Sequence, residues 1–167
     1  MELLFSTPHG SRLYGLHHAN SDYDRFEVYG WDKGRAKQRI YGSADVTTTS
    51  LDRFLRSCDK GVPQYLEAMF SQQATVDHIP YIREKYYPNM TNVRDVYKRT
   101  MKAFWMEGTE EGSLKLRRHA LRLSLNLEAM ENTGRFNPTL TPDEARWCTE
   151  TAERATEYPF GGTDGTD

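Results

Sequence analysis

The chain has 167 residues, 28% of them charged, and a formal net charge of −2. A chain of this length can form one domain with a substantial core, and its near-neutral charge excludes a strongly basic nucleic-acid-binding protein. No apolar run approaches the ~18 residues of a membrane span, and the N-terminus lacks the features of a signal peptide.

The two cysteines, Cys58 and Cys148, are far apart and do not have the spacing of metal ligands. They are typical of a reducing compartment without disulfide bonds, so we expect a cytoplasmic protein that does not associate with a membrane. Any RNA or DNA partner has to be held by a local basic patch.

The first half of the chain alternates short strand patterns with turns. A turn is expected at Thr7-Pro8, followed by a short helix within residues 11–18. Residues 32–34 predict the turn of a hairpin between the second and third strands. The four predicted strands cover residues 1–6, 24–31, 36–41 and 44–49.

The second half is predicted to be helical. Ser50 can cap a helix with an apolar face, Gly61 ends it, and Pro63 suits the first turn of the next helix. Further helices are expected over residues 91–105, 114–133 and 142–156. Between and after them we expect an irregular tract at 78–88, a polar loop at 107–113 and a disordered tail at 159–167.

The stretch from Gly10 to Asp24 carries the strongest chemical signal. Gly10 has no Cβ, so backbone amides can approach a phosphate closely, and Ser11 adds a hydroxyl donor. Asp22 and Asp24 are two residues apart, so on a strand both carboxylates face the same side. Such a pair can bind Mg²⁺ together with substrate phosphates. The alternative is an acidic turn exposed to solvent, whereas the spacing excludes an EF-hand.

This order of parts resembles the nucleotidyltransferase superfamily of DNA polymerase beta. In that superfamily a Gly-Ser pair precedes Asp-x-Asp, and a third carboxylate lies on a later strand. Asp45 lies within the predicted strand 44–49, although Asp is depleted in strands. It is either an edge-strand charge that faces solvent or the third carboxylate. In the second role Asp45 would help to hold the metal and would accept the proton of the attacking hydroxyl.

The chain is similar, over residues 4–134, to one branch of this superfamily, the RNA-repair-associated polymerase-beta-like nucleotidyltransferases. The branch pattern Gly-Ser-Arg-x-x-Gly before Ser-Asp-x-Asp matches Gly10, Ser11, Arg12, Gly15, Ser21, Asp22 and Asp24. Its Leu-x-x-Phe-Leu helix, Gly-x-Pro turn and Leu-Glu pair match Leu51, Phe54, Leu55, Gly61, Pro63, Leu66 and Glu67. For Glu67, a site role and a solvated or capping charge are both open.

The predicted helix 114–133 carries two stripes. The residues expected to face the core are Leu116, Ala120, Leu123, Leu127 and Met130. A separate cationic stripe consists of Lys115, His119 and Arg122. The branch has a Lys-x-x-x-His-x-x-Arg-Leu helix of this kind, which implies a phosphate-facing role next to the acidic pair. An ordinary solvated helix surface is the alternative.

These patterns predict an α/β (α+β) fold, with a small mixed β-sheet nucleotidyltransferase core at residues 1–75 and a helical region at 76–158 packed on it. The expected reaction is transfer of an NMP from an NTP to a hydroxyl, with release of pyrophosphate. The resemblance implies Mg²⁺ or Mn²⁺ as cofactor and an RNA end as acceptor. Alternatives are a toxin-like enzyme that modifies tRNA or a protein, and an inactive module that binds NTP or RNA.

Each expected site residue has a stated role. The residues expected to hold the metal and carry catalysis are Asp22, Asp24 and Asp45. The residues expected to bind the NTP are Gly10, Ser11, Arg12, Ser21, Lys115, His119 and Arg122.

Overall fold

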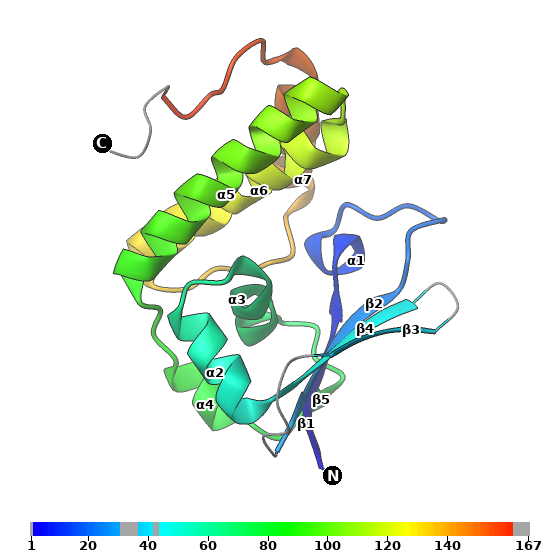
Figure 1. Ribbon diagram of the computed structural model, residues 1–167, viewed down its shortest axis with the longest axis vertical. Helices are drawn as coiled ribbons and strands as arrows, with labels where there is room; N and C mark the ends of the chain where they lie inside the picture. The colour runs from blue at the N-terminus through cyan, green and yellow to red at the C-terminus, as the bar shows by residue number, and fades with distance from the viewer. Residues whose placement is uncertain (1, 31–36, 42–43, 162–167) are drawn as a thin grey trace.

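The computed structural model describes residues 2–30, 37–41 and 44–161. It confirms the predicted α/β fold, with a mixed sheet from the first half of the chain and a helical array from the second (Figure 1). None of the helices within these ranges is long and apolar enough to cross a membrane.

The described part of the sheet has the strand order β3-β4-β2-β1-β5. β1 pairs antiparallel with both β2 and β5, β2 pairs parallel with β4, and β3 pairs antiparallel with β4. The strands are β1 (Leu3–His9), β2 (Asp24–Tyr29), β3 (Lys37–Tyr41), β4 (Ala44–Ser50) and β5 (Val76–Asp77).

The hairpin predicted between the second and third strands is wrong. β4 lies between β3 and β2, so β3 pairs with the strand that follows it. Strand patterns show which residues are extended, but they do not say which strand becomes the neighbour. The predicted turn at 32–34 lies outside the described residues.

The first strand extends further than predicted and includes Thr7 and Pro8. Pro8 is opposite Arg25 of β2, whereas β5 covers only an earlier part of β1 on its other side. Pro8 therefore lies where β1 is an edge strand, and a missing N–H is tolerated there. The extension carries β1 to His9, directly before Gly10.

Helices follow the sheet-forming segments and dominate the second half. They are α1 (Ser11–Tyr14), α2 (Leu51–Asp59), α3 (Pro63–Phe70), α4 (Pro80–Lys85), α5 (Met90–Glu111), α6 (Leu114–Thr133) and α7 (Pro142–Arg154). Three of these, α2, α6 and α7, occur where they were predicted, within two residues at their ends, and α3 starts at Pro63 as expected.

Two expectations for this half are wrong. The tract predicted to be irregular contains α4, which starts at Pro80, a favoured residue at the first helical position. The predicted loop at 107–113 is mostly the last turns of α5, which ends at Gly112 with a φ of 68°. Within residues 107–111 only Gly108 is buried, and the polar residues are exposed. The polar run therefore forms the solvent-facing surface of the helix and does not interrupt it.

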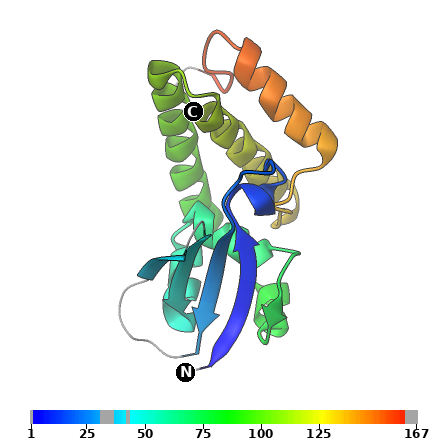
Figure 2. The same cartoon turned by 90° about the vertical axis from the view of Figure 1, so that its right-hand side faces the viewer.

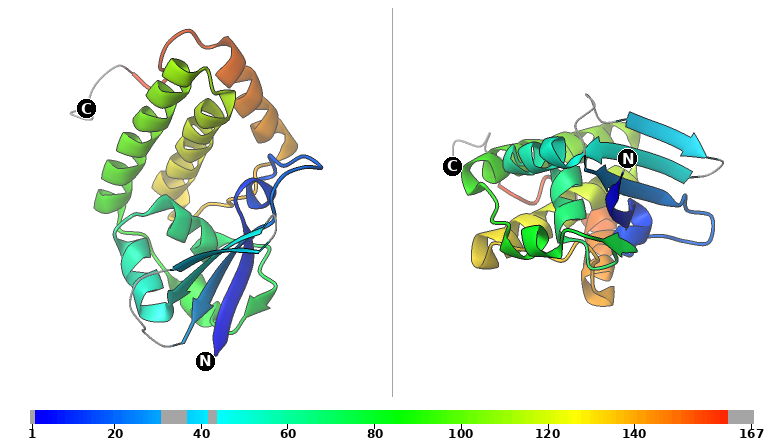
Figure 3. Two further views of the ribbon diagram at one scale, coloured as in Figure 1. Left: turned by 45° about the vertical axis from the view of Figure 1, so that its right-hand side comes forward. Right: turned by 90° about the horizontal axis from the view of Figure 1, so that it is seen from below.

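The main core lies between the sheet and the helices, and it draws on both halves of the chain. Phe5, Phe26 and Phe54 come from β1, β2 and α2, and they contact a cluster that includes Tyr97 of α5 and Leu123 of α6. α5 and α6 run side by side beyond one end of the sheet (Figure 2, Figure 3). Of the five residues expected to face the core from α6, four are buried and Leu116 is half-buried.

A second cluster lies beneath α7 and includes Trp105, Leu121 and Cys148. Phe160 packs against both clusters, so the expectation of a disordered tail is wrong at this residue. Its large apolar ring has more to gain from burial than the Gly, Thr and Asp residues that follow. The rest of the expected tail, residues 162–167, lies outside the described part of the chain.

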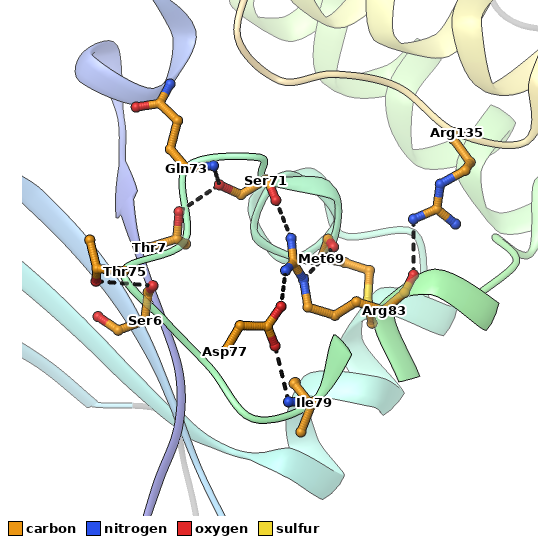
Figure 4. Close-up of polar contacts among 10 residues, drawn as sticks. All are labelled: Ser6, Thr7, Met69, Ser71, Gln73, Thr75, Asp77, Ile79, Arg83 and Arg135. Atoms are coloured by element: carbon orange, nitrogen blue, oxygen red, sulfur yellow. Dashed lines mark hydrogen bonds and ion pairs between the residues drawn. The ribbon is translucent and has the colours of Figure 1, made fainter. Parts of the chain in front are cut away.

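Arg83 of α4 connects the segment after α3 to the rest of the fold (Figure 4). Its Nε donates to the carbonyl of Met69 over 3.0 Å, and its terminal nitrogens donate to the Ser71 carbonyl and the Asp77 carboxylate. Arg135, in the loop after α6, in turn donates to the carbonyl of Arg83 over 2.9 Å. These bonds attach the helical region to the sheet region on the side away from Gly10 and Asp24.

Candidate active site

The Gly10-Ser11 turn begins where β1 ends, and its geometry requires a glycine. Gly10 has a φ of 68°, and a Cβ there would lie 2.6 Å from Oδ2 of Asp24. A side chain is therefore excluded both by the backbone conformation and by the carboxylate. α1 follows directly and ends at Gly15, so it is shorter than the helix predicted within residues 11–18.

The acidic residues gather at the start of β2 and β4. Asp24 is the first residue of β2, and its Oδ1 accepts a 3.4 Å hydrogen bond from the backbone N–H of Asp45 on β4. Burial raises the pKa of Asp24, and the negative charges of Asp45 and Asp22 raise it further against this hydrogen bond. The negative charges of Asp22 and Asp45 therefore both act on the Asp24 carboxylate.

These carboxylates do not by themselves form a metal cage. Within the described residues, no group of three or more His, Cys, Asp or Glu side chains is arranged to hold a metal ion. Mg²⁺ is commonly bound by only one or two carboxylates together with substrate phosphates. An oxygen-only set of repelling carboxylates beside a close-approach glycine fits that mode of binding.

A cleft of about 650 Å³ connects this acidic end of the sheet with α6. Eight of the residues predicted to form the site line it, namely Gly10, Ser11, Ser21, Asp22, Asp24, Lys115, His119 and Arg122. The structure thus brings the cationic stripe and the acidic pair to one cleft from segments far apart in the chain. Arg12 and Asp45 are not among the residues that line it.

Arg12 holds the loop that carries Asp22. Its Nε and Nη2 donate to the carbonyls of Asp22 and Ser21 over 3.2 and 2.9 Å. The guanidinium also stacks on the ring of Tyr23, 3.6 Å from its centroid. These bonds use Nε and one N–H of Nη2, so Arg12 shapes the loop between α1 and β2, and its role in NTP binding stays a prediction.

Three buried side chains at the base of the cleft form what we call the buried relay, Tyr14, Glu67 and Arg122. The Tyr14 hydroxyl donates to Oε1 of Glu67, and Nη1 of Arg122 donates to Oε2 over 2.6 Å. The guanidinium also lies over the ring of Tyr14, 3.7 Å from its centroid. Glu67 is therefore a buried ion-pair partner and not a solvated or capping charge. Its place between apolar neighbours on α3 was the available sequence signal.

His119 extends the buried relay towards the cleft. Its Nδ1 lies 3.2 Å from Nη2 of Arg122. Burial lowers the pKa of His119 to about 3, and the positive charges of Arg122, Lys115 and Arg118 contribute to the same shift. The imidazole is therefore neutral at neutral pH.

The cationic stripe predicted on α6 therefore does not present three exposed positive charges. Of the three residues only Lys115 is an exposed cation, since His119 is neutral and Arg122 is buried in its ion pair with Glu67. Spacing placed the three residues on one helix face correctly, but their charge states depend on neighbours from α1 and α3.

His9 is a site residue that no sequence pattern indicated, apart from its place next to Gly10. It lines the cleft, is 6% exposed, and burial lowers its pKa. Its Nδ1 is buried and has no hydrogen-bond partner among the described residues. The imidazole packs between Tyr14 and Phe26, with ring centroids 6.2 and 5.6 Å away.

Comparison with known proteins finds no matching family model and no matching curated sequence. The resemblance to polymerase-beta-like nucleotidyltransferases therefore rests on the sequence motifs alone.

Proposed function

We propose that the protein is a metal-dependent nucleotidyltransferase that moves an NMP from an NTP to a hydroxyl and releases pyrophosphate. The observation that carries the proposal is the single cleft in which Gly10 and Ser11 meet Asp22 and Asp24, opposite Lys115. It combines a close backbone approach for phosphate, carboxylates for a hard cation and a positive charge for the triphosphate.

In this proposal each wall of the cleft has a separate task. Asp22 and Asp24, with Asp45 beside them, would hold Mg²⁺ or Mn²⁺, which supplies charge neutralisation and orientation of the phosphates. Gly10 and Ser11 would receive the β and γ phosphates, and Lys115 would offset part of their charge.

The chemical step forms one bond and breaks one bond. The acceptor oxygen attacks the α-phosphorus, the bond to the β-phosphate oxygen breaks, and pyrophosphate leaves with the electron pair. The proton of the acceptor hydroxyl passes to the Asp45 carboxylate and then to water. An RNA end is the acceptor that the family resemblance suggests. The free, buried cysteines fit a reducing compartment, and we place the reaction in the cytoplasm.

A turnover assay tests the proposal. The protein is incubated with each of the four labelled NTPs, Mg²⁺ or Mn²⁺, and total RNA, and transfer of label and release of pyrophosphate are measured. We expect label in RNA with the wild type and none with Asp22→Asn, because a neutral amide lacks the negative charge that helps a carboxylate bind Mg²⁺. Asp22 is exposed, so this variant should fold normally.

Several outcomes separate the alternatives. Label in the protein or tRNA fraction would indicate the toxin-like reaction. NTP binding without turnover would indicate an inactive binding module. Wild-type turnover by Asp22→Asn would contradict the proposed site.

A further inference from the structure

The cleft wall formed by α6 contains a residue whose hydrogen-bonding state the structure determines. His119 is the only imidazole on this wall among the described residues that line the cleft, and it contacts the buried relay through Nδ1. Arg122 and Glu67 are both almost completely inaccessible to solvent, so this contact is not exchanged with water.

The direction of every bond in the relay follows from chemistry. A guanidinium carries only donors, and a carboxylate paired with it only accepts. Arg122 therefore donates to Glu67 on one side and to Nδ1 of His119 on the other. Since Nδ1 accepts, the neutral imidazole must carry its proton on Nε2.

The charged groups around His119 keep it in the neutral form. Lys115, Arg118 and Arg122 of α6 all disfavour a positive imidazolium. From α1 the edge of the Tyr14 ring packs on it, and Glu67 of α3 is already neutralised by Arg122. Among the described residues, the charges that act on the pKa of His119 are therefore the positive ones of α6, which oppose its protonation.

Aromatic packing also fixes the orientation of the ring. Its centroid is 6.1 Å from that of Tyr14 and 5.8 Å from that of Phe104 on α5. With Nδ1 bonded to Arg122, Nε2 is the ring nitrogen left for a ligand, and it makes no hydrogen bond to another described residue.

We infer that the buried relay holds His119 as its neutral Nε2–H tautomer, which makes His119 a fixed hydrogen-bond donor to an oxygen of the nucleotide in the cleft. Arg122 is then a positioning residue that acts through His119 and does not bind phosphate itself. That the ligand is a nucleotide rests on the proposed function. The tautomer and its dependence on the relay do not.

The tautomer is measured on the free protein. In ¹⁵N-histidine-labelled protein, long-range ¹H–¹⁵N correlation spectra distinguish the two neutral tautomers and the cation. We expect the Nε2–H pattern for His119 throughout pH 5.5–8. An Nδ1–H pattern, or a cation at pH 6, would overturn the inference.

A double substitution tests the relay without leaving a buried charge unpaired. Glu67→Met/Arg122→Met replaces the ion pair by apolar side chains, an exchange that buried pairs often tolerate. We expect His119 to become a mixture of tautomers. Arg94→Met/Glu131→Met is the matched control, because it removes an exposed ion pair between α5 and α6 and should leave the spectrum of His119 unchanged. If the relay variant fails to fold, Tyr14→Phe is used in its place, because it removes only the hydroxyl donor to Glu67. We then expect the tautomer mixture of His119 to change in the same direction by a smaller amount.

Ligand binding is tested by titration with each of the four NTPs and Mg²⁺. His119→Phe keeps an aromatic ring but loses the donor, so the Kd of the tightest-binding NTP should rise about fivefold, the effect of one neutral hydrogen bond. The relay variant should show a smaller rise, because only part of its His119 keeps the Nε2–H donor, and the control none. An unchanged Kd in His119→Phe would overturn the inference. If no NTP binds the wild type while the Nε2–H tautomer is present, the proposed function fails and the relay itself is supported.

Discussion

The two walls of the cleft differ in how far the charges of their side chains are neutralised by neighbouring groups. On the sheet wall, Asp22 is exposed. Burial raises the pKa of Asp24, and the charges of Asp45 and Asp22 raise it further. On the helical wall, Arg122 is paired inside the protein and His119 is neutral. One wall has unbalanced negative charge, whereas the other has most of its positive charge neutralised.

This difference has a physical use. Free cations opposite the carboxylates would form ion pairs with them and would compete with a divalent metal ion. Because the cation of Arg122 is bonded to Glu67, the carboxylates have only Lys115 as an exposed cation among the three stripe residues. In the proposed function, the helical wall would then contribute orientation and a neutral donor, and the carboxylates of the sheet wall would stay available for a metal ion.

The largest effect is expected on the sheet wall. If Asp45 is the general base, Asp45→Ala should slow transfer by ~10²–10⁴-fold, the usual contribution of proton transfer, while NTP and Mg²⁺ still bind detectably. Single-turnover rates and equilibrium binding measured on the same preparations separate the two effects. An unchanged rate would mean that Asp45 is only a structural residue of β4, which lies inside the sheet, and that Asp22 and Asp24 act without it.

On the helical wall the main effect should be on stability. Glu67→Ala leaves the guanidinium of Arg122 buried without its partner, which should lower the free energy of unfolding by about 3–5 kcal/mol. Glu131→Ala is the control, because Glu131 forms an exposed ion pair with Arg94 and its loss should change stability little. Denaturant unfolding curves of the two variants give the comparison. Equal destabilisation of both would contradict the contrast between buried and exposed pairs.

The smallest effect concerns the neutral state of His119. In the unfolded chain a histidine has a pKa near 6.5, whereas in the folded protein the pKa of His119 is about 3. Below pH 6.5 the unfolded state therefore binds a proton that the folded state does not bind. Stability from this residue is thus complete above pH 6.5 and declines as pH falls towards 3.

This decline is measured as a difference between two proteins. From pH 8 to pH 5 the wild type should lose about 2 kcal/mol more stability than His119→Phe, since the substitution removes the group that titrates. His9 is present in both proteins, so its contribution cancels. If the free energy of unfolding changed with pH equally in the wild type and the variant, the pKa of His119 would be the same in the folded and unfolded states.

Local patterns in the sequence determined the elements and much of the site. Ser50, Thr141 and Gly134 mark helix ends where the structure has them, and the apolar stripe of α6 faces the core. The Gly10-Ser11 pair and the Asp-x-Asp motif also lie together at one end of the sheet. These features follow from backbone conformation and side-chain spacing over a few residues, which a sequence displays directly.

Only the tertiary structure decided strand partners and charge states. β3 joins β4 and not β2, Glu67 becomes the buried partner of Arg122, and His119 loses its charge. Each of these depends on a neighbour that is distant in the chain. The pKa of an ionisable group follows from its burial and nearby charges, so its spacing along a helix cannot reveal whether it will carry a charge.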